Sequence, residues 1–165
     1  QERALQNVRR ALKPGGWFFF NSAFYAESRP PESLPFYKAQ IANAVRKLKE
    51  LGITREKKER PNASSFESQT YYQQLLQQVG FAVRDLRAEA ARLYKSAWEN
   101  ISGFSQYAAG ALHGYQPDVA AKVLREAVGP SLERHGIPDE NNDLYIPRNW
   151  LAAAAQVVNQ KSSKA

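Results

Sequence analysis

Apolar side chains recur every three or four positions in four stretches of the chain, which is the spacing of one face of a helix. The expected helices are residues 4–12, 36–51, 66–80 and 118–134. Pro14 cannot continue the first helix, and Gly15–Gly16 can make a tight reversal. The chain is therefore expected to end its first helix before Pro14 and to reverse direction at Gly15–Gly16.

Polar and small residues mark the ends of the other expected helices. Ser68 and Asp118 are placed to cap helix N-termini, and Gly52 and Gly80 are placed to end helices. Gly129–Pro130 is expected to interrupt the last helix, because proline does not continue a helix that precedes it.

Three stretches have the pattern of strands. Residues 17–20 (WFFF) are aromatic and uncharged, as in a strand covered on both faces within a parallel sheet. Residues 81–86 alternate apolar and polar side chains. In residues 144–158, Ala152–Ala155 favours helix on propensity, but we predict a strand, because propensity is weak evidence and small side chains suit a strand covered by helices.

The remaining stretches are expected to be loops or irregular segments. They are the proline-rich residues 27–35, the long charged and polar loop 54–65, the aromatic and irregular residues 91–117, the turn-rich residues 135–143 and a disordered tail, 160–165.

Composition excludes several kinds of site. There is no cysteine, and two histidines are too few for an ordinary structural zinc site, so no metal is expected. No apolar run reaches the eighteen or so residues of a membrane span, and we expect a soluble, cytoplasmic protein. The net charge of +7 would allow a nucleic-acid partner, but the basic residues near positions 46–60 are interleaved with glutamates, which is more typical of a solvated surface.

Three motifs resemble class I S-adenosylmethionine-dependent methyltransferases and occur in the order that this family has. LKPGG before an aromatic strand is similar to the segment before the family's fifth strand, LLQQVGF to its last crossover into the sixth, and IPRNWL to its last strand. The resemblance implies a partial doubly wound, Rossmann-like α/β sheet of about three strands with covering helices, the last strand antiparallel. It makes residues 1–159 the C-terminal part of one methyltransferase domain, with 26–65 and 91–143 as inserted helices and loops that cover the substrate.

The cofactor half of such a domain is not found in these residues. The family holds S-adenosylmethionine on a glycine-rich turn that follows a strand, and the chain has no G-x-G-x-G. Gly15–Gly16 precedes a strand and lies on the wrong side to form that cradle. We expect S-adenosylmethionine to bind only to the complete protein, no residue of this chain to be a cofactor ligand, and the isolated chain to expose apolar sheet surface.

Methyl transfer requires mainly that acceptor and methyl group be held close and aligned, so the expected site is a shaped pocket. The carboxyl ends of strands are where ligands bind in open α/β sheets. The candidate substrate-binding residues at the end of the first strand are Asn21, Ser22, Phe24 and Tyr25, with ordinary loop packing as the alternative.

A second group of candidates could form an aromatic lid over the acceptor, although side chains at near-helical spacing are more often core. These candidates are Tyr94, Trp98, Phe104 and Tyr107. His113 could be a general base, because an unperturbed imidazole titrates near neutral pH, but a lone histidine is more commonly structural. Within the last motif we expect Trp150 to be buried and Arg148 to anchor a carboxylate or a backbone group.

Two hypotheses of different classes remain open. The first is methyl transfer to a small-molecule acceptor by the complete protein, with no membrane partner. The second is a non-enzymatic, basic helical module that binds a protein or RNA partner. The acceptor and the oligomeric state are not predicted by the sequence.

Overall fold

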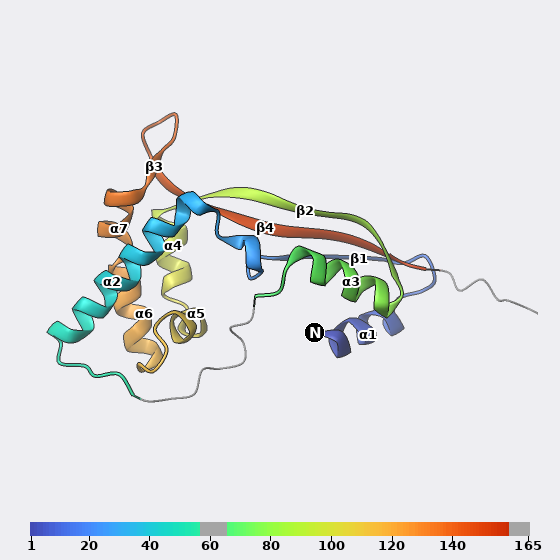
Figure 1. Ribbon diagram of the computed structural model, residues 1–165, viewed down its shortest axis with the longest axis horizontal. Coiled ribbons are helices and arrows are strands. Elements are labelled where there is room, and N and C mark those ends of the chain that lie inside the picture. Colours follow the sequence, from blue (N-terminus) through green and yellow to red (C-terminus); the bar gives the residue numbers. More distant parts are fainter. Residues whose placement is uncertain (57–65, 159–165) are drawn as a thin grey trace, which may run out of the picture. The chain divides into compact units, whose positions relative to one another are not determined.

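The computed structural model describes residues 1–56 and 66–158. Its helices are α1 (Glu2–Ala11), α2 (Leu34–Glu50), α3 (Gln69–Val79), α4 (Lys95–Ser102), α5 (Ser105–Ala111), α6 (Pro117–Glu126) and α7 (Val128–His135), with short 3₁₀ helices η1 (Ala26–Ser28) and η2 (Pro31–Ser33) (Figure 1). Its strands are β1 (Trp17–Ser22), β2 (Phe81–Tyr94), β3 (Ile137–Pro138) and β4 (Leu144–Val157). No helix among the described residues is both long and apolar enough to cross a membrane.

The strands form one sheet in the order β1-β4-β2, with the short β3 paired to β4. β4 runs antiparallel to β1, from the pair Trp17–Gln156 to the pair Ser22–Leu151. It also runs opposite to β2, since the Val158 amide donates to the Gly80 carbonyl at 3.2 Å where β2 begins (Figure 1). β1 and β2 therefore point the same way, with the antiparallel β4 between them.

The chain divides into two compact units, and each has its own core. In unit 1, whose described residues are 1–28, 66–90 and 149–158, helices α1 and α3 contribute apolar side chains to one face of the sheet. Phe18 and Phe20 of β1 pack there with Leu76 and Phe81. The alternation of a strand sends the neighbouring side chains to the opposite face.

The opposite face of β1 is open. Trp17 and Phe19 are 47% and 67% exposed, and their rings stack with centroids 5.6 Å apart. The expectation that residues 17–20 are paired in a parallel sheet and covered on both faces is therefore wrong for this chain. The expected exposure of apolar sheet surface is present.

Unit 2, whose described residues are 29–56 and 91–148, contains helices α2 and α4–α7. One cluster of its core joins Ala44 and Leu48 of α2 to Val123 and Leu124 of α6. A second cluster is aromatic and surrounds Trp98.

The first three expected helices are confirmed as α1, α2 and α3. Ser68 caps α3 by accepting a hydrogen bond from the Tyr71 amide at 3.1 Å, and Gly80 ends it in the left-handed region with φ of 94°. The fourth is two helices, α6 and α7, which meet at Ala127 rather than at Gly129–Pro130. Asp118 is not its cap and instead accepts a hydrogen bond from the Ser105 hydroxyl at 3.1 Å.

The strand prediction for residues 144–158 is confirmed by β4. Leu151, Ala153, Ala155 and Val157 are buried and alternate with partly exposed residues, so small side chains do face a covered surface there. β2 extends well past the expected 81–86, residues 91–117 contain α4 and α5, and residues 27–35 contain 3₁₀ turns. The long loop at 54–65 lies largely, and the tail 160–165 entirely, outside the described residues.

Candidate functional site

The carboxyl end of β1 carries two of the predicted substrate-binding residues. Asn21 is exposed, and Ser22, the last residue of the strand, is partly buried. The Ser22 hydroxyl accepts a hydrogen bond from the Phe24 amide at 3.1 Å, a local side-chain bond that turns the chain out of the sheet. Asn21 therefore remains accessible, while Ser22 shapes the turn.

The other two residues of this group differ from each other. Phe24 is 51% exposed and stacks on Phe66 with ring centroids 6.3 Å apart. Tyr25 is fully buried, and its hydroxyl has no hydrogen-bond partner among the described residues. Burial, together with the nearby Glu27 carboxylate, raises the pKa of Tyr25. A phenol with a raised pKa stays protonated at neutral pH and can donate a hydrogen bond.

In unit 2, an aromatic cluster forms around Trp98 of α4. The Trp98 ring lies 5.0 Å from that of Phe36 and 5.2 Å from that of Tyr37, the latter edge-to-face at 88°. Trp98 is fully buried, and its indole N–H has no hydrogen-bond partner in the described part of the chain. The predicted lid residue Trp98 is thus a core side chain in this structure.

A buried arginine of β4 completes this cluster. Arg148 is 1% exposed and donates a hydrogen bond from Nη1 to the Tyr37 hydroxyl at 2.8 Å. Its guanidinium carbon also lies 5.9 Å from the centre of the Trp98 ring. Arg148 therefore anchors the phenol of Tyr37, a partner that the sequence did not predict. Trp150 is only partly buried, less than expected.

Two positive charges act on Tyr37. Arg148 bonds its hydroxyl, and the exposed Arg29 places its guanidinium carbon 4.5 Å from the centre of its ring. Burial nevertheless raises the pKa of Tyr37 to about 12, because it outweighs the lowering by the two arginines. Burial likewise raises the pKa of Tyr107, whose hydroxyl Arg148 also bonds. Both phenols are hydrogen-bonding groups at neutral pH and not bases.

The other predicted residues lie in different surroundings within unit 2. The Tyr94 hydroxyl donates to the Asp139 carboxylate at 2.8 Å, and Phe104 is 63% exposed. The backbone carbonyl of His113 accepts a hydrogen bond from Arg55 Nε at 2.9 Å. Of the four predicted lid residues, the structure brings together Trp98 and Tyr107, both through Arg148.

Tyr37 and Arg29 were not among the residues that the sequence singled out. Tyr37 follows Phe36 in the apolar stripe of α2, so its pattern indicates core alone. The available signal was Arg148, a lone cation within the otherwise apolar IPRNWL segment, because a buried charge requires partners.

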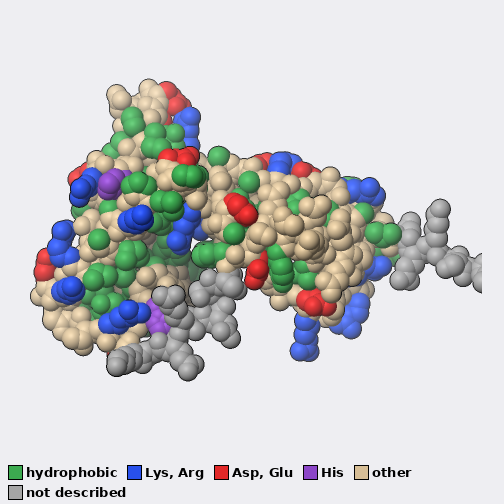
Figure 2. Space-filling view, viewed as in Figure 1, with side chains coloured by type: hydrophobic (Ala, Val, Ile, Leu, Met, Phe, Trp, Pro, Cys, Tyr) green, Lys and Arg blue, Asp and Glu red, His purple; other side chains and the backbone are tan. Residues whose placement is uncertain are grey.

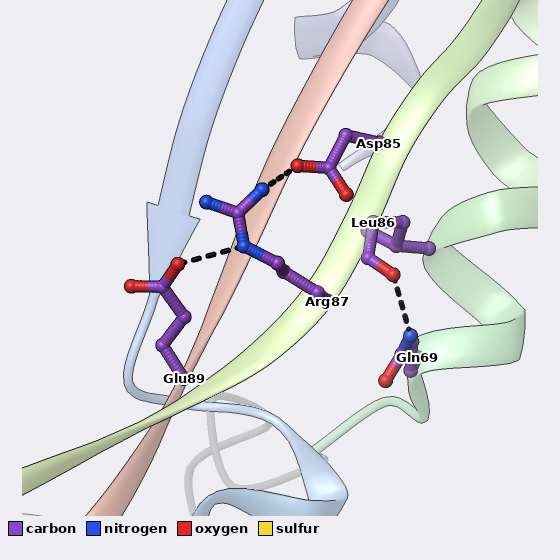
Figure 3. A network of polar contacts seen from close by, with 5 residues as sticks. All are labelled: Gln69, Asp85, Leu86, Arg87 and Glu89. Atoms are coloured by element: carbon purple, nitrogen blue, oxygen red, sulfur yellow. Dashed lines mark hydrogen bonds and ion pairs between the residues drawn. The ribbon is translucent and has the colours of Figure 1, made fainter.

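Acidic side chains on β2 are engaged with a neighbouring arginine. Residues 85, 87 and 89 share one face of the strand, and Arg87 pairs with both Asp85 and Glu89 (Figure 3). The Gln69 side-chain amide Nε2 donates to the Leu86 backbone carbonyl at 2.9 Å on the same stretch. The two carboxylates are thus ion-paired on an exposed surface, and the described residues contain no group of three or more potential metal ligands.

Comparisons with known proteins give a weak structural likeness and no sequence match. No protein-family model matches the chain, and no curated protein matches its sequence. Similar solved structures include a protein from Bacillus halodurans C-125 named a "putative methyltransferase", at 8% identity and a TM-score of 0.45. The alignment covers 95% of this chain and 58% of that one, so the chain spans somewhat more than half of that protein's length.

Proposed function

We propose that the complete protein transfers a methyl group from S-adenosylmethionine to a small-molecule acceptor, and that this chain is the C-terminal part of that enzyme. The observation that carries the proposal is the sheet: β1 and β2 point the same way, and the last strand, β4, runs antiparallel to both. The LKPGG, LLQQVGF and IPRNWL motifs lead into or lie on these three strands in the order that the methyltransferase resemblance implies.

The described residues do not fit the cofactor itself. A dinucleotide-type cradle needs a glycine-rich turn after a parallel strand. Gly15 and Gly16 lie before β1, and Gly80 lies before β2. The cofactor would therefore be held by residues that precede Gln1, and no residue described here is assigned to it.

The open surface of β1 supports the proposal that a further part of the protein, which holds the cofactor, packs against this chain. β1 is the terminal strand of the sheet formed by the described residues, and Trp17 and Phe19 of its open face are exposed. An unpaired strand edge and an uncovered aromatic face are what the remaining strands and helices of a larger sheet would cover. The N-terminal half would extend the sheet from this edge.

The residues of this chain would act on the acceptor by position. S-adenosylmethionine supplies the electrophilic methyl group, and a protein accelerates its transfer largely by aligning the acceptor. Asn21 and Phe24 are the accessible groups at the carboxyl end of β1 and would contact the acceptor there.

The coding sequence upstream of Gln1 provides the first test. A strand followed by E-x-G-x-G-x-G there would support the proposal, whereas an unrelated domain would contradict it.

A calorimetric titration provides the second test. S-adenosylmethionine should bind to the protein that includes the upstream half and should not bind to residues 1–165 alone. Tight binding by the 165-residue chain would contradict the assignment of the cofactor site to the upstream half.

A further inference from the structure

A groove runs along one side of α2 in unit 2. It has a volume of about 770 Å³, within the roughly 300–1,000 Å³ that is typical of small-molecule sites. Its apolar wall is formed by Leu34, Ile41, Ala42 and Val45. These residues recur at helical spacing on α2, and Leu34 is 41% exposed, so this stripe is only partly covered by the rest of the unit.

The charged side chains around the groove are all basic. Among the described residues that line it, the charged ones are Arg29, Lys38, Arg46 and Lys49, and no acid is present. Figure 2 shows basic and hydrophobic side chains side by side over this part of unit 2. Lysine and arginine can rest their aliphatic stems on an apolar wall while their charged ends stay in water. The groove therefore has an apolar wall and a positively charged rim.

At one end of the groove the side chains are held by specific contacts. Tyr37 lines it there, with the guanidinium of Arg29 4.5 Å from the ring centre and Arg148 bonded to the hydroxyl from the core side. A guanidinium stacked on an aromatic ring has its N–H groups in its own plane. This planar fork matches the geometry of a carboxylate. From Tyr37 to Val45 the helix rises about 12 Å, which leaves an apolar path beside the charged end.

We propose that this α2 groove binds a small carboxylic acid with an apolar chain, its carboxylate at Arg29 and its chain along Ile41 and Val45. Charge complementarity favours an anion, and the apolar wall favours a hydrocarbon body over a sugar or a nucleotide. The fixed position of Arg29 over Tyr37 favours a single carboxylate over a membrane surface, which a diffuse basic and apolar face would fit better. The inference concerns binding to this chain and does not depend on methyl transfer.

The test is a calorimetric titration of the full chain with decanoate, kept below its micelle concentration. We expect saturable binding of one molecule per chain, weaker at high salt because the charged rim is exposed. Decanol lacks the charge and acetate lacks the chain, so both should bind at least about tenfold more weakly.

Two exposed positions provide variants that leave the core intact. Arg29→Gln should weaken decanoate binding about tenfold, and Ala42→Glu, which adds a carboxylate to the groove wall, should weaken it at least as much. The matched control is Lys47→Gln, which removes one positive charge from α2 outside the groove and should change affinity by less than about twofold.

Several results would overturn the proposal. They are the absence of saturable decanoate binding, equal affinity for decanol, and equal losses in Arg29→Gln and Lys47→Gln. Binding to anionic phospholipid vesicles without binding of monomeric decanoate would also overturn it and identify a membrane surface instead.

Discussion

At the scale of single residues, Tyr37 connects the core of unit 2 to its surface. Its ring packs edge-to-face on Trp98 and lies under Arg29, while its hydroxyl accepts a hydrogen bond from the buried Arg148. A buried guanidinium that loses a partner leaves a donor unsatisfied, which is more costly than a neutral hydrogen bond is favourable. The phenol of Tyr37, together with that of Tyr107, therefore stabilises an otherwise expensive buried charge.

We expect Tyr37→Phe to lower the free energy of unfolding at pH 7 by about 1–3 kcal/mol, since the lost hydrogen bond involves a charged donor. Urea unfolding followed by circular dichroism measures this. Tyr94→Phe is the matched control, because the Tyr94 hydroxyl donates at the surface to Asp139, and its loss should matter less. An equal effect of the two substitutions would contradict the role given to Tyr37.

Alkaline pH tests the same residue without relying on the hydrogen bond. The pKa of Tyr37 is raised to about 12 in the folded protein, so above pH 10 the unfolded chain ionises first. The contribution of the protonated Tyr37 to the free energy of unfolding is complete below pH 10. It is lost as pH rises towards 12, by up to about 3 kcal/mol at 1.36 kcal/mol per pKa unit. The wild type should therefore lose more stability than Tyr37→Phe over this range, and parallel losses would contradict a raised pKa.

At the scale of helices and strands, glycine acts differently at Gly80 and at Gly110. Gly80 ends α3 with φ of 94°, whereas Gly110 lies within α5 without a positive φ and with open space where a Cβ would be. The same substitution should therefore have opposite effects at the two positions.

Gly80→Ala should destabilise the protein by about 1–2 kcal/mol, because an L side chain is strained in the left-handed region. A Cβ there meets only Arg9 Nε at 3.6 Å, an ordinary contact, so the backbone and not a clash is the cause. Gly110→Ala should stabilise it by about 0.5–1 kcal/mol through helix propensity. Thermal unfolding of both variants checks the signs, and a shift of the same sign in each would contradict this account.

Sequence pattern predicted those elements whose determinants are local. The apolar spacing and the flanking Pro14, Ser68 and Gly80 gave α1, α2 and α3, since caps and periodicity act within a few residues. The length of β2 was missed because residues 87–92 carry mixed charges and no apolar face, and pairing with β4 keeps them extended. For β4, the covering of small side chains outweighed the helix propensity of alanine.

The candidate site was predicted less well, and the reason is distance along the chain. Arg148 and Tyr37 are 111 positions apart, and neither side chain has a local pattern that points to the other. Asn21 and Phe24 could be predicted because the end of a strand can be located from the local sequence pattern. Their role in binding an acceptor stays a prediction.

At the scale of the whole molecule, the chain carries an apolar sheet surface that its own described residues leave uncovered. Trp17 and Phe19 stack on one another beside Gln156 and Ala154 of β4, on the face opposite to Phe18 and Phe20. Exposed aromatic strands at a sheet edge promote association between copies. The isolated chain is therefore expected to self-associate.

Replacing both Trp17 and Phe19 by threonine should reduce this self-association, because threonine keeps strand propensity and removes the aromatic surface. Sedimentation velocity across a range of concentrations would show a larger monomer fraction. Phe104→Thr is the matched control, an exposed phenylalanine of unit 2 that should not change the distribution. If the control and the sheet variant behave alike, the open face of β1 is not the cause.

The placement of Trp98 has an optical consequence. Trp98 is enclosed by aromatic rings in unit 2, whereas Trp17 and Trp150 belong to unit 1 and are partly or largely in contact with water. The emission of Trp98 should therefore lie at shorter wavelength and shift to the red when the core of unit 2 opens. With Trp17 and Trp150 replaced by phenylalanine, fluorescence would follow unit 2 by itself, and comparison with circular dichroism would tell whether the two units unfold in one transition or in two.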